Sequence, residues 1–181
     1  MASYGVNIVV KLLSWMPKLL CYDNYAGNWD NFIADVYTIF ENDFKTTKPI
    51  FRTLPVNHDS RIIDGREAGF WHIVQKEDNT TGTRIPDFRR CEHIPWPKPI
   101  IENCNDSEVW IWDKEIKKSG YGRQVRVVLW LEKFDYVVIL RVRSKEMILV
   151  TAYCVIYESH KKKLQLERNE YIKQKTPRRA A

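Results

Sequence analysis

The sequence predicts an α+β domain in which N-terminal helices pack on a four- to five-stranded antiparallel sheet that ends in a three-strand meander. Apolar residues at helical spacing near the start of the chain and alternating apolar segments near its end predict this fold. With 181 residues, the chain can bury about 70% of its unfolded surface. We expect a single domain over residues 1–175, with an apolar extension over 1–24, a C-terminal basic helix over 158–175 and a flexible tail over 176–181.

The first periodic segment predicts an amphipathic helix over residues 29–44. Its apolar residues recur every three or four positions, Asn28 stands at the N-cap position, and Asp30 lies in the first turn. Residues 49–56 then predict a short edge strand, and the apolar run 69–74 is typical of an extended segment. The first two thirds of the chain therefore mix helix with short strands.

Residues 75–106 predict a long basic loop braced by prolines. Pro95, Pro97 and Pro99 surround Trp96 within it. Loops of this length are uncommon unless they are disordered or functional, and the apolar residues of this one argue against disorder. We therefore expect the loop to carry function.

Three alternating apolar segments near the end of the chain predict the antiparallel meander. They cover residues 124–131, 136–143 and 147–157. Their apolar faces agree if Leu131 pairs with Tyr136 across the first turn. They also agree across the second turn if Arg143 pairs with Met147.

The last of these segments separates two kinds of side chain. Alternation assigns Ile148 and Val150 to an apolar face, and Thr151 and Tyr153 to the opposite one. A core strand has no packing need for two hydroxyl groups. The open face of the sheet is therefore where we expect a polar ligand to bind.

Charge is unevenly distributed along the chain. The last 24 residues hold eight Lys or Arg against three Glu, which accounts for +5 of the net charge of +6. Such a segment favours polyanions through counterion release. A solvated helical extension would have the same composition, so both interpretations stay open.

The four cysteines are widely spaced and predict free thiols in a reducing compartment. Cys91, His93 and Cys104 lack the spacing of a zinc site, and we expect no metal and no other cofactor. The apolar run at residues 8–20 is short and is interrupted by Lys11, Pro17 and Lys18, so it predicts no membrane span. A cytoplasmic protein is expected.

Motifs for nucleotide-dependent, hydride-transfer, esterase and metalloprotease chemistry do not occur in the chain, which leaves binding or metal-free acid-base chemistry. RNA cleavage without metal needs a proton acceptor, a proton donor and fixed cations around the phosphate. The candidate catalytic residues are His72, Arg84, Arg89, Arg90, Thr151 and Tyr153. The alternative is that the histidine is a hydrogen-bonded sheet residue, the arginines a solvated loop, and the last pair ordinary strand residues.

Four further residues are candidates for nucleic-acid binding: Lys76, Trp96, Arg126 and Arg141. The two arginines are predicted to lie side by side on the open face of the meander. The tryptophan offers a surface for base stacking, although an indole flanked by prolines is often a structural residue.

Three sequence segments resemble a phage-associated bacterial family of the barnase/EndoU/colicin/RelE nuclease superfamily. They are residues 69–73 (GFWHI), 84–96 (RIPDFRRCEHIPW) and 149–153 (LVTAY), and the resemblance covers about residues 25–172. It implies helices on a four-stranded antiparallel sheet, metal-independent RNase activity and a site on the open sheet face.

Within this resemblance, His72 matches the motif histidine, and Arg84 with Arg89 or Arg90 matches the basic residues. The hydroxyl pair of the last strand completes the match. A second histidine is not evident, and His93 is the nearest candidate.

The leading hypothesis is therefore a small metal-independent RNase, toxin-like or phage-related, with RNA as substrate and a small neutralising protein as a further partner. The alternative is a non-catalytic module that binds nucleic acid or a phage protein on the same fold. A third is a scaffold whose open face makes an oligomer contact.

Overall fold

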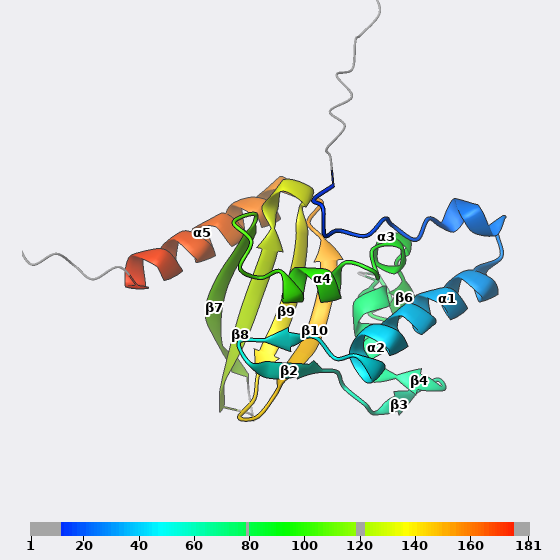
Figure 1. The fold of residues 1–181 in the computed structure, drawn as a ribbon, viewed down its shortest axis with the longest axis horizontal. Helices are drawn as coiled ribbons and strands as arrows, with labels where there is room; N and C mark the ends of the chain where they lie inside the picture. Colours follow the sequence, from blue (N-terminus) through cyan, green and yellow to red (C-terminus); the bar gives the residue numbers. More distant parts are fainter. Residues whose placement is uncertain (1–11, 79, 119–121, 176–181) are drawn as a thin grey trace, which may run out of the picture.

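The structure is a computed structural model that describes residues 12–78, 80–118 and 122–175. It is an α+β fold with a curled, mixed six-stranded sheet and two small two-stranded sheets (Figure 1). The first eleven residues of the expected N-terminal extension and the whole expected tail lie outside the described residues. Within the described ranges, no helix has both the length and the apolar character needed to cross a membrane.

The helices are α1 (Trp29–Glu41), α2 (Ala68–Val74), α3 (Phe88–Glu92), α4 (Pro97–Glu102) and α5 (Glu158–Lys175). Short helical turns are η1 (Tyr22–Tyr25), the π-helical η2 (Asn42–Thr46) and η3 (Glu132–Phe134). The strands are β1 (Ile50–Phe51), β2 (Leu54–Asn57), β3 (Ile62–Ile63), β4 (Arg66–Glu67), β5 (Gln75–Glu77), β6 (Arg84–Pro86), β7 (Val109–Lys118), β8 (Gly122–Leu131), β9 (Tyr136–Val142) and β10 (Met147–Cys154).

The large sheet has the strand order β1-β2-β10-β9-β8-β7, and this corrects the predicted antiparallel sheet of four to five strands. Residues 49–56 form two strands, not one. The second of these, β2, lies parallel to β10, while the meander β7-β8-β9-β10 is antiparallel. Parallel pairing joins segments about 90 residues apart, so a local pattern does not reveal it.

The register of the meander is confirmed at its first turn, where Leu131 pairs with Tyr136. At the second turn the prediction is wrong by one residue, since Met147 pairs with Val142. A β-bulge between Leu149 and Thr151 then absorbs one residue of β10. A bulge of this kind places two residues of one strand opposite one of its partner.

The bulge divides β10 into two halves whose side chains alternate between the two faces of the sheet in opposite order. Before it, Met147 and Leu149 point into the main core, so the predicted core positions of Ile148 and Val150 are wrong. After it, Thr151 pairs with Ile139 on the opposite face, as predicted. Alternation alone cannot show an inserted residue, because the pattern on either side of a bulge remains regular.

Helix α1 begins as predicted. The Asn28 side chain caps it by accepting a hydrogen bond from the Asn31 amide at 3.0 Å. Its buried residues face the main core, and Phe44 continues that contact from the π-helical turn that follows.

Residues 68–74 form helix α2, so the extended segment predicted there is wrong. Phe70, Ile73 and Val74 lie three and four positions apart, and all are buried. An apolar run this short fits helix and strand equally well, and packing on the sheet decides between them. His72 therefore stands on a helix beside the sheet.

The predicted loop over residues 75–106 is largely regular structure. It contains the hairpin β5-β6 and the short helices α3 and α4. Asp87 caps α3 by accepting a hydrogen bond from the Arg90 amide at 3.1 Å, and Pro97 occupies the first turn of α4. These cap and proline signals are the ones that mark helix starts.

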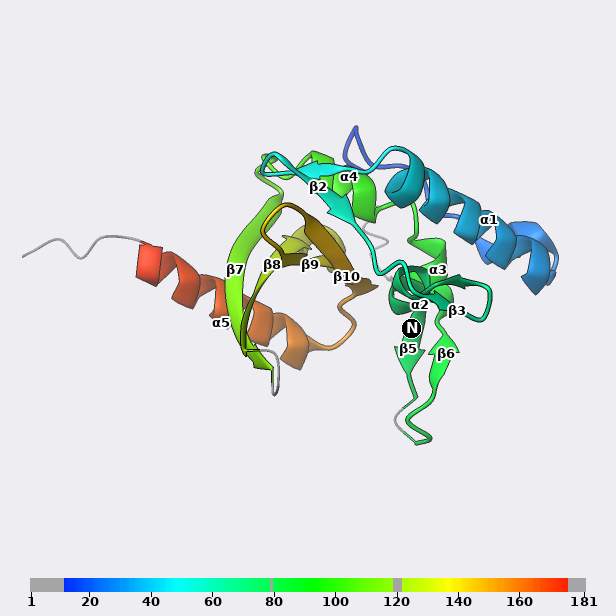
Figure 2. The same cartoon turned by 90° about the horizontal axis from the view of Figure 1, so that it is seen from below.

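The two faces of the sheet have separate cores. The main core lies between one face, which we call the α1 face, and helices α1, α2 and α4, with Val127, Leu129 and Leu140 among its sheet residues. A smaller core on the other face, the α5 face, includes Trp130 and contacts Leu164 of α5. Figure 2 shows α5 lying across this second face.

Gly69 is a point of close approach between α2 and the preceding chain. A Cβ atom there would lie 2.8 Å from His58 Cβ and 2.9 Å from the Asp59 amide nitrogen. We expect Gly69→Ala to lower the free energy of unfolding by about 1–3 kcal/mol through overpacking, measured by chemical denaturation. Gly82→Asn is the control, because its position is open and asparagine tolerates positive φ. Equal stability of the two variants would contradict this prediction.

Candidate functional site

Two adjoining pockets lie where the β5-β6 hairpin, α2 and α3 meet β10 and the start of α5. The first, the His160 pocket, has a volume of about 580 Å³. The second, the His72 pocket, has a volume of about 360 Å³. Lys76, Glu77 and Arg90 line both, so the two pockets adjoin one another.

Arg90 stands between the two pockets. Its Nη1 atom donates a hydrogen bond to the Gln75 carbonyl at 2.7 Å and to Thr151 Oγ1 at 3.4 Å. Its guanidinium carbon lies 5.5 Å from the centre of the Tyr153 ring, a cation–π distance. Burial lowers the pKa of Arg90 from its ordinary value, yet an arginine remains cationic at neutral pH.

Thr151 ties the last strand to helix α2. Its hydroxyl accepts the hydrogen bond from Arg90 and donates one to the His72 carbonyl at 3.2 Å. The β-bulge turns this hydroxyl toward the pocket. The three residues are therefore held by one connected set of hydrogen bonds.

The His72 side chain lines its pocket together with Arg84, Arg90 and Thr151. Burial, and then the positive charge of Arg84, lower the pKa of His72 below its ordinary value of about 6.5. The imidazole is therefore mainly neutral at pH 7.

Tyr153 faces a second histidine, which the sequence analysis missed. Its hydroxyl lies 3.4 Å from His160 Nε2, and the two rings stack with centroids 5.6 Å apart. Burial raises the pKa of Tyr153, so the phenol keeps its proton. Burial, and then the charge of Lys163, lower the pKa of His160.

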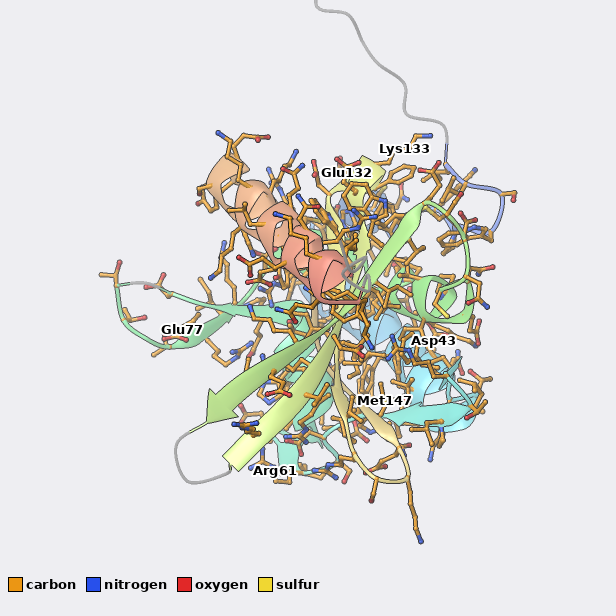
Figure 3. The ribbon with its side chains drawn as sticks, turned by 90° about the vertical axis from the view of Figure 1, so that its left-hand side faces the viewer. Asp43, Arg61, Glu77, Glu132, Lys133 and Met147 are labelled. Carbon is orange, nitrogen blue, oxygen red and sulfur yellow. The ribbon has the colours of Figure 1, made fainter. Side chains whose placement is uncertain are left out.

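His160 lies here because only three residues connect the end of β10 to the start of α5. The Val155 amide donates a hydrogen bond to the Asp135 carbonyl at 2.6 Å, and Lys161 forms an ion pair with the Asp135 carboxylate at 2.6 Å. These contacts fold the first turn of α5 back over the end of the strand. Figure 3 labels Glu132 and Lys133 in the β8–β9 connection at this end of the sheet.

The remaining basic candidates are on the hairpin and α3. Arg84 Nη2 donates to the Gln75 carbonyl at 3.0 Å, so it shares this acceptor with Arg90. Lys76 forms an ion pair with Asp87 at 3.2 Å, and Arg89 lines the His160 pocket with an exposed side chain. Figure 3, which labels Glu77 on the hairpin, shows the hairpin projecting beside the sheet.

Trp96 is not available for base stacking, which corrects that prediction. Its indole is 4% exposed, and Nε1 donates to the Pro17 carbonyl at 3.1 Å. His93 is also directed elsewhere, because its ring stacks on Tyr136 at 5.3 Å and Nδ1 lies 2.6 Å from the Arg89 carbonyl. Both residues serve the core beneath α3 and α4.

Arg126 and Arg141 pair across β8 and β9, as predicted, but the face that holds them is not open as expected, because Leu164 of α5 packs there in the second core with Trp130. The two arginines lie on the same face of the sheet as Thr151, beyond Val128 and Ile139.

All four cysteines carry free thiols, and Cys91 is buried with its thiol 3.7 Å from the Val74 carbonyl. Across the described ranges, no group of three or more His, Cys, Asp or Glu side chains is close enough to hold a metal ion.

Comparisons of the chain with models of known protein families, with curated proteins and with solved structures found no match. The resemblance to a nuclease superfamily therefore stays a prediction, and the geometry of the two pockets carries the functional argument.

The pKa of His160 offers a direct check of this geometry. We expect its ring to titrate below the ordinary value of about 6.5 in an NMR titration of the histidine Cε1 protons. Lys163→Ala removes a positive charge that disfavours the imidazolium, so it should raise this pKa. Lys162→Ala, at an exposed neighbouring position, is the control and should leave it unchanged. Identical titration in both variants would contradict the placement of His160.

Proposed function

We propose that the protein is a metal-independent endoribonuclease of the barnase/EndoU/colicin/RelE type that cleaves RNA by attack of the 2′-hydroxyl on the adjacent phosphate. The observation that carries this proposal is the position of Arg90 between two pockets, one lined by His72 and the other by His160. The guanidinium of Arg90, which can bind the phosphate, thus has a histidine-lined pocket on either side.

Cleavage of this kind needs one group to take the 2′ proton and another to protonate the leaving 5′ oxygen. His72 and His160 supply this pair, since an imidazole changes its charge near neutral pH. The guanidinium of Arg90 stabilises the negative charge that develops on the phosphate oxygens. Its hydrogen bonds to Gln75 and Thr151 hold it in place before substrate binds.

Tyr153 and Thr151 are positioning residues in this scheme. The phenol stays protonated and lies against His160, so it orients that ring. The threonine hydroxyl connects Arg90 to the main chain of His72. Arg84, Arg89 and Lys76 add positive charge around the pockets and attract the RNA backbone.

A second candidate function is binding of nucleic acid without cleavage. The two arginines of the α5 face, Arg126 and Arg141, favour it, because an interaction with phosphate through these side chains does not require any proton transfer. Affinity for RNA without turnover would distinguish this function from the first.

The proposal is tested by incubating the purified chain with single-stranded RNA in excess EDTA. We expect cleavage with a 2′,3′-cyclic phosphate product, and a loss of about 10²-fold or more in rate for His72→Ala, His160→Ala or Arg90→Ala. His93→Gln is the matched control, with folding of every variant checked by thermal unfolding. Absence of cleavage by the wild type, or equal rates in His160→Ala and the control, would reject the proposal.

The pH dependence follows from the two lowered histidine pKa values. One imidazole must be neutral and the other protonated, and both have a pKa below about 6.5. The profile of kcat/KM should therefore be bell-shaped with its maximum below about pH 6.5. It falls at higher pH as the acid loses its proton, and at lower pH as the base gains one. An optimum above about pH 8 would contradict the assignment of two histidines.

A further inference from the structure

Three cations form a continuous row across the α5 face of the sheet. Lys114 on β7 pairs with Arg126 on β8, which in turn pairs with Arg141 on β9. We call these residues the cationic row. Neighbouring strands lie about 4.8 Å apart, so the row extends over about 10 Å. Ile148 of β10 occupies the next position and ends the row beside the candidate site.

This row of like charges destabilises the sheet. Like charges directly opposite one another on antiparallel strands are destabilising. Glu167 of α5 forms an ion pair with Lys114 and compensates only that end. The Nε atoms of Arg126 and Arg141 are buried, and neither has a hydrogen-bond partner among the described residues. Buried polar atoms of this kind are uncommon in native proteins and call for an explanation.

A small cavity connects the row to the candidate site. It has a volume of about 210 Å³ and lies between the sheet and α5. Of the cationic row, Lys114 and Arg126 line it from the sheet. Lys163 and Glu167 line it from α5, and Tyr153 and His160 line it as well. The same two aromatic rings line the His160 pocket, so they separate the two spaces.

The row also approaches the candidate site along the strands. Arg141 lies two residues from Ile139 on β9, and Ile139 pairs with Thr151. Two residues of a strand span about 7 Å. A chain of phosphates bound beside Thr151 can therefore continue onto the row without leaving the face of the sheet.

We propose that the cationic row binds the sugar-phosphate backbone of single-stranded RNA next to the cleavage site. This inference rests on the proposed function and specifies its substrate as a single strand several nucleotides long. The length of the cationic row, about 10 Å, exceeds the rise of about 3.4 Å per nucleotide in a stacked strand. The row therefore contacts more than one phosphate.

The occupant is a single strand because of what surrounds the row. Helix α5 lies across this face (Figure 2), and a cavity of this size beneath it admits phosphates of one strand but not a duplex. Grooves that bind single strands combine a line of positive charge with adjacent aromatic rings, and Tyr153 supplies one beside the row.

Binding is tested with a 2′-O-methyl oligonucleotide of about 12 nucleotides, which 2′-hydroxyl attack cannot cleave. We expect Arg126→Gln and Arg141→Gln each to weaken binding several-fold. Each should also reduce the slope of log K against log salt by about 0.7 for every phosphate that the protein no longer neutralises. Arg123→Gln is the matched control, since it removes an exposed arginine from the opposite face of the same strand. Affinity in the row variants equal to that of the control would overturn the proposal.

Stability gives a second readout that separates binding from misfolding. Because the row opposes folding, Arg126→Gln and Arg141→Gln should have melting temperatures equal to or above that of the wild type. If poly-glutamate competes for the row as well as the oligonucleotide does, the site takes an acidic protein and the RNA assignment is overturned.

Cleavage distinguishes this inference from the proposed function. On the same reasoning, the row variants should lower kcat/KM for a long RNA several-fold and leave cleavage of a dinucleotide unchanged. Equal loss on both substrates would overturn the row as a site for the extended strand. A wild type that binds the oligonucleotide through the row but cleaves neither RNA would reject the nuclease and retain the binding site.

Discussion

The arrangement of the candidate site depends on the hydrogen bonds that hold Arg90 in its half-buried place. The Gln75 carbonyl and the Thr151 hydroxyl accept from its guanidinium, and Thr151 in turn binds the main chain of His72. Helix α2, helix α3, the hairpin and the last strand therefore meet at one side chain. A cation kept away from full solvation interacts with an anionic ligand more strongly than one free in water.

Local patterns in the sequence predicted the elements in which the spacing of apolar and polar residues follows their burial. The capped helix α1 and the paired strands β8 and β9 have a regular period, and Thr151 and Tyr153 follow it in the second half of β10. By contrast, α2 is seven residues long and its apolar run fits either helix or strand. Its identity was decided by contacts with the sheet.

The candidate site shows the same division. Arg84, Arg90, Thr151 and His72 were found from residue type and position, and they do line one pocket. His160 was missed because it falls in a segment that was predicted only as a basic helix. The available signal was the three-residue connection between β10 and α5, which returns the first helical turn to the strand it follows. Trp96 was misassigned because flanking prolines do not indicate whether an indole is buried.

The irregularity in β10 has a consequence for how this strand tolerates change. Its two halves obey opposite parities: odd-numbered side chains enter the main core before the irregularity, and even-numbered ones after it. Loss of a single residue at Val150 would merge them into one uninterrupted ladder. Point substitutions can therefore vary the chemistry of this strand gradually, whereas the gain or loss of a residue anywhere other than at Val150 exchanges inside for outside over part of it.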